Sequence, residues 1–131
     1  MTMEDEKRFL LLLASFSISH NFQQEDPTKE DPTKAEVLDE IDSKQWALFD
    51  PQKYQMKSNR KEVIWRNDLA FIRKHLVING FFIAGVRNNW GITEEGREKL
   101  RELCQMVFNT QNFKCITAAA VSDARVLYPY I

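Results

Sequence analysis

Cysteine and histidine, which often serve in catalysis and metal binding, are scarce in this sequence of 131 residues. The two cysteines, Cys104 and Cys115, are too few for a disulfide framework and form no C-x-x-C pair, so we expect a reducing compartment. The two histidines, His20 and His75, have no ligand-spaced partners, which argues against a metal site. A glycine-rich phosphate loop and a nucleophile elbow are also missing. We therefore expect no enzyme activity, no metal and no cofactor.

Long apolar runs are missing as well. The longest, Phe9 to Ala14, is far shorter than the roughly 20 residues that span a bilayer. The acidic residues Glu4, Asp5 and Glu6 precede it, and they have the wrong sign for a secretory signal. These absences predict a soluble, cytoplasmic protein without membrane contact.

The charged residues are divided unevenly along the chain, although the net charge is only -1. Residues 1–52 carry 5 Lys and Arg against 12 Asp and Glu, whereas residues 53–101 carry 11 against 5. We expect the basic residues of 53–101 to gather on one outer surface, as an electrostatic footprint for nucleic acid requires. With 44% hydrophobic residues, the chain fits a single domain over residues 1–131.

The first half of the chain predicts two helices separated by a loop. Apolar residues at helical spacing predict a first helix over 6–19, and a second is expected over 33–46 as the first member of a helix-turn-helix pair. Residues 20–34 contain EDPTK twice in succession, and the prolines and charges indicate an exposed loop.

The middle of the chain predicts a recognition helix over 64–79. Its inner stripe is spaced at i, i+4, i+7 and i+11 and consists of Trp65, Leu69, Ile72 and Leu76. Gly80 suits the end of this helix, because glycine tolerates the positive φ that often follows a last turn.

A β-hairpin is expected over 81–92, with its turn in the stretch Gly85 to Asn89. Thr93 can then cap a helix over 93–109, and residues 110–131 form a C-terminal extension with one more short helix. A helix followed directly by a hairpin predicts the fold class: mainly α with a small β-hairpin, a winged helix-turn-helix.

A set of positions in this middle stretch carries a resemblance to a known family. They are Arg66-Asn67, Phe71, Arg73, Leu76, Gly80, Gly85, Arg87, Trp90, Ile92-Thr93 and Glu95-Gly96. With these positions the stretch resembles the N-terminal domain of Mrr-type restriction proteins, over about a third of the chain. The sequence departs from the family pattern at Asn88-Asn89, where a wing glycine is common, and at Phe71-Ile72, where Trp-Ala is usual.

The resemblance implies a winged helix that targets DNA in a restriction system. The cleavage domain that accompanies it in the family is not in this sequence, so we expect no nuclease activity.

The candidate DNA contacts fall into three groups. The basic segment directly before the recognition helix, called the approach, suits phosphate contacts, and so does the wing tip. The outer face of the helix suits base edges in a major groove. The alternatives are an ordinary solvated helix face and a turn selected only for its φ angles. Phe71 could touch the methyl group of a modified base, whereas Trp65 and Trp90 read as core. The candidates are Lys57, Asn59, Arg60 and Lys61 in the approach, Arg66, Asn67, Phe71 and Lys74 on the helix, and Arg87, Asn88 and Asn89 in the wing.

Arg73 differs from these candidates, because it borders the apolar stripe of the predicted recognition helix. We expect it to be a structural arginine that tethers the wing or a neighbouring helix.

The sequence therefore predicts binding of double-stranded DNA, plain or methylated, by the targeting module of a restriction or defence system. The competing interpretations are a winged-helix module for protein interaction or dimerisation, and a stand-alone transcriptional regulator. A homodimer or a nuclease would be the protein partner.

Overall fold

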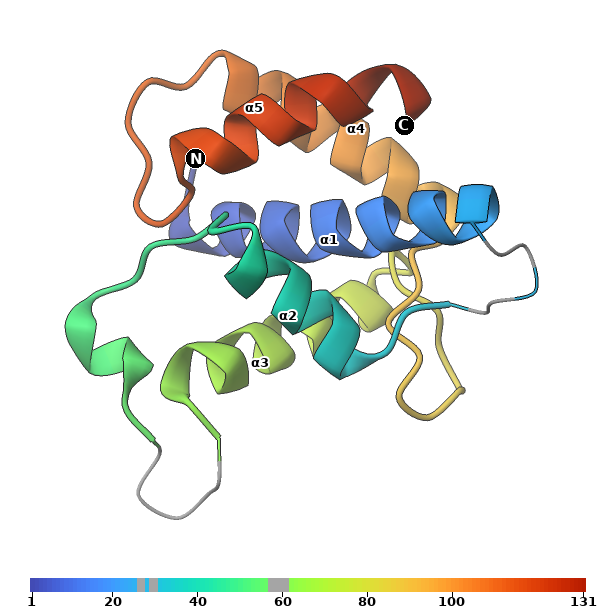
Figure 1. Ribbon diagram of the computed structural model, residues 1–131, viewed down its shortest axis with the longest axis horizontal. Coiled ribbons are helices and arrows are strands. Elements are labelled where there is room, and N and C mark those ends of the chain that lie inside the picture. Colours follow the sequence, from blue (N-terminus) through green and yellow to red (C-terminus); the bar gives the residue numbers. More distant parts are fainter. Residues whose placement is uncertain (26–27, 29–30, 57–61) are drawn as a thin grey trace.

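The computed structural model describes residues 1–25, 28, 31–56 and 62–131. Helix α1 crosses the middle of the molecule, with α2 and α3 on one side and α4 and α5 on the other (Figure 1). The elements described are α1 (Met3–Glu25), α2 (Lys34–Ser43), η1 (Pro51–Tyr54), α3 (Ile64–Ile78), α4 (Glu94–Phe108), α5 (Ala118–Leu127) and η2 (Tyr128–Tyr130), where η marks a 3-10 helix.

Helix α1 is the centre of the core. Every residue from Phe9 to Ile18 is buried, so the helix is covered on its whole circumference rather than on one stripe. Its two buried serines are satisfied, because Ser15 Oγ donates to the carbonyl of Trp90 at 2.7 Å and Ser17 Oγ donates to Glu40 at 3.0 Å. None of the helices in the described part of the chain has the length and apolar character needed to cross a bilayer.

The predicted β-hairpin wing is wrong. The described residues form no β-strand, and the segment 81–92 contains only one isolated antiparallel bridge, between Phe82 and Ile92. The physical reason is that the returning segment bonds elsewhere. The Trp90 N–H donates to the carbonyl of Pro32 at 2.8 Å, so the pairing ends after one bridge.

The predicted winged helix-turn-helix is wrong for a second reason. Helices α2 and α3 are not joined by a short turn, because residues 44–63 lie between them and include η1. A residue distant in the sequence holds part of this connection, because Ala47 forms an isolated antiparallel β-bridge with Ile116. The mainly α part of the prediction agrees with the structure.

Glu6 fixes the first turn of α1 against the segment before α5. Its side chain is buried, and its carboxylate accepts the backbone N–H groups of Lys114, Cys115 and Ile116 at 2.8–3.1 Å. Burial by itself raises the pKa of Glu6, but these three hydrogen bonds outweigh it, and the pKa lies below its ordinary value of 4.5. Together with burial, the charge of Glu6 raises the pKa of the Cys115 thiol to about 12.

Helix α4 begins in close contact with the end of α3. The Thr93 side chain accepts the Gly96 N–H at 3.0 Å and donates to the carbonyl of Gly80 at 2.6 Å. This leaves no room at Gly96, where a Cβ atom would lie 2.1 Å from the Phe81 carbonyl oxygen. Gly80 has space around it but a φ of +78°.

We predict that Glu6→Gln lowers the free energy of unfolding at pH 7 by about 2–3 kcal/mol, because a neutral amide with one acceptor oxygen cannot serve three buried N–H groups. A lowered folded pKa gives stability that is present above the unfolded value of 4.5 and is lost as the pH falls through the folded value. Urea titrations between neutral and acidic pH should therefore show a weaker loss on acidification in the variant. Glu98→Gln, at an exposed position on α4, is the matched control. An unchanged acid dependence in Glu6→Gln would contradict this role.

We also predict that Gly96→Ala costs more stability than Gly80→Ala. The first substitution forces backbone apart and should cost about 3 kcal/mol, whereas the second adds only the strain of a positive φ, about 1–2 kcal/mol. Thermal unfolding of both variants measures the order. The reverse order would show that α4 does not need this close approach.

Candidate nucleic-acid interface

Helix α3 has one buried stripe and one exposed stripe. The predicted inner residues Trp65, Leu69, Ile72 and Leu76 are its buried residues. The opposite stripe is spaced at i, i+4, i+7 and i+11 and is formed by Asn67, Phe71, Lys74 and Ile78. Phe71 and Ile78 are 56% and 80% exposed. The outer stripe therefore has one positive charge and two apolar side chains available for contact.

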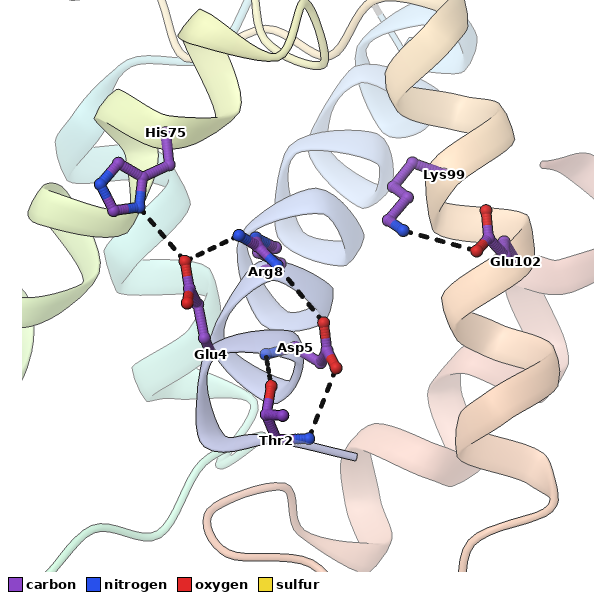
Figure 2. Close-up of polar contacts among 7 residues, drawn as sticks. All are labelled: Thr2, Glu4, Asp5, Arg8, His75, Lys99 and Glu102. Atoms are coloured by element: carbon purple, nitrogen blue, oxygen red, sulfur yellow. Dashed lines mark hydrogen bonds and ion pairs between the residues drawn. The ribbon is translucent and has the colours of Figure 1, made fainter.

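The outer stripe is steadied by a contact between α3 and α1. His75 Nδ1 lies 3.2 Å from a carboxylate oxygen of Glu4, which also pairs with Arg8 at 2.7 Å (Figure 2). The Phe71 ring packs edge-on against the His75 ring at a centroid distance of 5.1 Å. This contact between His75 and the first turn of α1 did not follow from sequence spacing.

Arg66 is directed to α2 rather than left free for DNA. Its guanidinium donates to Asp39 at 2.9 Å and to Asp42 at 3.4 Å, and it lies 5.0 Å from the centroid of the Trp65 ring. Carboxylates from the acidic residues of 1–52 therefore neutralise the charge of Arg66.

Arg73 ties α3 to the loop that replaces the predicted wing, as expected from its position beside the apolar stripe. It donates to the carbonyl of Asn89 at 2.9 Å and lies 5.6 Å from the Trp90 ring centroid. Burial lowers the pKa of Arg73 below its ordinary value. Trp65 and Trp90 are both buried, as predicted.

The loop tip is bound to the first residue of α2 and to the segment before it. The side-chain oxygen of Asn88, a residue with φ +56°, accepts the Lys34 N–H at 3.1 Å. Asn89 donates to Asp31 at 3.1 Å and accepts the Gly91 N–H at 2.8 Å. Arg87 is exposed beside them. Two of the three predicted wing contacts thus serve the loop itself.

The described basic residues of 53–101 do not gather on one surface. Three of them belong to α4, which lies across α1 from α3 (Figures 1 and 2). Lys74 and Arg87 are those whose side chains make no ion pair or hydrogen bond with other described residues. The partners of the others are Asp68 for Lys53, Asp39 and Asp42 for Arg66, the Asn89 carbonyl for Arg73, Glu94 for Arg97, Glu102 for Lys99 and the Ile131 carbonyl for Arg101.

The remaining candidates, Lys57, Asn59, Arg60 and Lys61, lie outside the described residues. Among the described residues, no three His, Cys, Asp or Glu side chains form a group that could hold a metal ion.

Sequence reasoning named Phe71 but missed the other exposed apolar residues of this region. Ile78 completes the exposed stripe of α3, and Val86 is 55% exposed in the adjoining loop. The signal for Ile78 was present, because it continues the spacing of Asn67, Phe71 and Lys74.

The outer stripe of α3 lies within a stretch of the chain that matches a known protein family. Residues 22–102 match the family model described as the Mrr N-terminal domain, and this match extends from the end of α1 into α4. No curated protein and no solved structure matches the chain. The matched stretch is more than half of the sequence and includes every residue on which the resemblance rested, so the chain belongs to the Mrr N-terminal domain family.

Proposed function

We propose that the chain binds duplex DNA as the targeting module of a restriction system, with α3 as the contact helix. The observation that carries the proposal is that Lys74 on the outer stripe of α3 and Arg87 in the adjoining loop form no ion pair with any other described residue. Phosphate contacts supply much of the affinity of DNA-binding proteins, and they need accessible positive charge.

The proposed contact uses the outer stripe of α3 in a major groove, which is about 12 Å wide and admits one helix. Asn67 pairs with an adenine edge, Lys74 binds a phosphate, and Arg87 binds the backbone beside the groove. Phe71 touches a thymine methyl group or the methyl group of a modified base. In this proposal the domain binds, and a nuclease domain or partner performs the cleavage.

Arg66 has a smaller part in this proposal than the sequence suggested. To reach a base it must leave two carboxylates, and those carboxylates then repel the phosphates nearby. Asn88 and Asn89 shape the loop that presents Arg87.

A second function is a protein contact or dimerisation through the same face. The observation in its favour is the apolar character of the outer stripe, where Phe71 and Ile78 are both more than half exposed; Val86, in the loop that follows α3, is exposed as well.

Binding to duplex DNA should weaken with salt, and the double variant Lys74→Glu/Arg87→Glu should bind far more weakly. Each lost phosphate contact should make the log-log salt dependence shallower by roughly 0.9. Fluorescence anisotropy at several salt concentrations measures this, with circular dichroism to verify folding.

The control for this experiment is Lys44→Glu, which reverses an exposed charge at the end of α2. Retention of full affinity in Lys74→Glu/Arg87→Glu, or an equal loss in Lys44→Glu, would refute the assigned contacts.

The second function predicts a different outcome for Phe71→Ser/Ile78→Ser. If the apolar face joins two copies, the wild-type protein sediments as a dimer and this variant as a monomer, because the exposed apolar area drives the association. Sedimentation velocity over a concentration series measures it. A wild-type protein that remains monomeric at all concentrations would exclude dimerisation through this face.

A further inference from the structure

A cavity of about 570 Å³ lies away from the outer stripe of α3, between the end of α2, the start of α3 and the start of α5. This volume is within the range of small-molecule sites. Segments distant in the sequence enclose it, and its lining is Ile41, Asp42, Gln45, Ala47, Leu48, Phe49, Tyr54, Trp65, Thr117, Ala118 and Ala119.

Aromatic rings form one wall of the cavity. Phe49 and Trp65 lie nearly parallel, with ring centroids 5.7 Å apart and an interplanar angle of 18°. Tyr54 is held beside them, because its hydroxyl accepts the Phe49 N–H at 3.0 Å. Rings fixed in this way offer a flat surface on which a planar ligand can stack.

Polar groups of both kinds lie on the other walls. Asp42 supplies carboxylate oxygens, and Ala118 and Ala119 supply the first two N–H groups of α5, which have no acceptor within the helix. Gln45 supplies an amide that can donate and accept. It follows α2 at φ +53°, a position where glycine is usual, so a side chain is kept at this wall despite the backbone strain.

The charge of the lining selects among planar ligands. The lining contains one carboxylate, that of Asp42, and no Lys or Arg, and Arg66 from outside the lining pairs with Asp42 Oδ2 at 3.4 Å. An anionic group therefore gains no direct cationic partner from the lining. A neutral ring with an amino group is favoured, since the amino group donates to Asp42 while ring acceptors meet the N–H groups of Ala118 and Ala119.

We infer that this cavity binds a nucleobase with an exocyclic amino group, stacked beside Phe49, Tyr54 and Trp65 and held at its edge by Asp42, Gln45 and the first turn of α5. Adenine, cytosine and guanine each carry an exocyclic amino group beside a ring acceptor, and thymine lacks the amino group. The base can come from a free nucleoside or be extruded from DNA. The second source rests on the proposed function.

The test uses the full chain with two matched variants. Ala119→Phe fills the cavity, and Ala35→Phe is the control, because both alanines are exposed second residues of helices capped by threonine, Thr117 and Thr33. Deoxyadenosine, deoxycytidine and thymidine are titrated by NMR. We expect the first two to shift the Ala118 and Ala119 amide signals and the Trp65 indole signal.

The added ring in Ala119→Phe blocks access to the stacking surface and should weaken nucleoside binding at least roughly tenfold. The Ala35→Phe variant should bind nucleosides as the wild type does. Asp42→Asn should reduce the preference for deoxyadenosine and deoxycytidine over thymidine. Because this substitution leaves the cavity volume unchanged, it still tests the inference if the Ala119→Phe variant does not fold. A duplex with adenine opposite an abasic site, compared with an intact duplex, tests the extruded base.

Binding of nucleosides without a preference for the abasic duplex assigns the cavity to free nucleosides. The outcome that overturns the inference is that neither nucleosides nor the abasic duplex perturb these signals, or that Ala35→Phe loses as much affinity as Ala119→Phe. Failure of the proposed function is seen separately, as duplex affinity that does not depend on Lys74 and Arg87.

Discussion

The burial of the central part of α1, from Phe9 to Ile18, is the constraint on which the rest of the structure depends. A helix covered on all sides needs packing partners around it, and α2 and α3 supply one side while α4 and α5 supply the other. Its polar groups must also find partners, which Ser15 finds at Trp90 and Glu6 finds at residues 114–116. These contacts fix the inner face of α3 and leave its outer stripe at the surface.

The uneven charge of the sequence is largely cancelled by local pairing when the chain folds. Arg66 lies against the acidic helix α2, and basic residues of α4 bind neighbouring carboxylates or carbonyl groups. Among the described residues, a block of like charge in the sequence therefore leaves only a few cations without an ionic or hydrogen-bonding partner. The exposed apolar side chains of Phe71 and Ile78 flank Lys74 on α3, so this surface is apolar as well as charged.

The features that depend on nearby residues could be predicted from the sequence. The buried stripe of α3, the Thr93 cap and the positive φ of Gly80 each follow from residues within one or two helical turns. The hairpin could not be judged in this way, because the bond that limits it joins Trp90 to Pro32. The pairing of Arg66 with α2, the burial of Glu6 and the aromatic cavity also join distant segments, which periodicity does not report.

The bond between Glu6 and residues 114–116 has a consequence for synthesis on the ribosome. Helix α1 is synthesised before the N–H groups that bind the Glu6 carboxylate, because these lie more than 100 residues further along the chain. Until then, burying that charge is unfavourable and the apolar surface of the nascent helix stays uncovered. Residues 114–116 must therefore be synthesised before the part of the core around Glu6 can be completed.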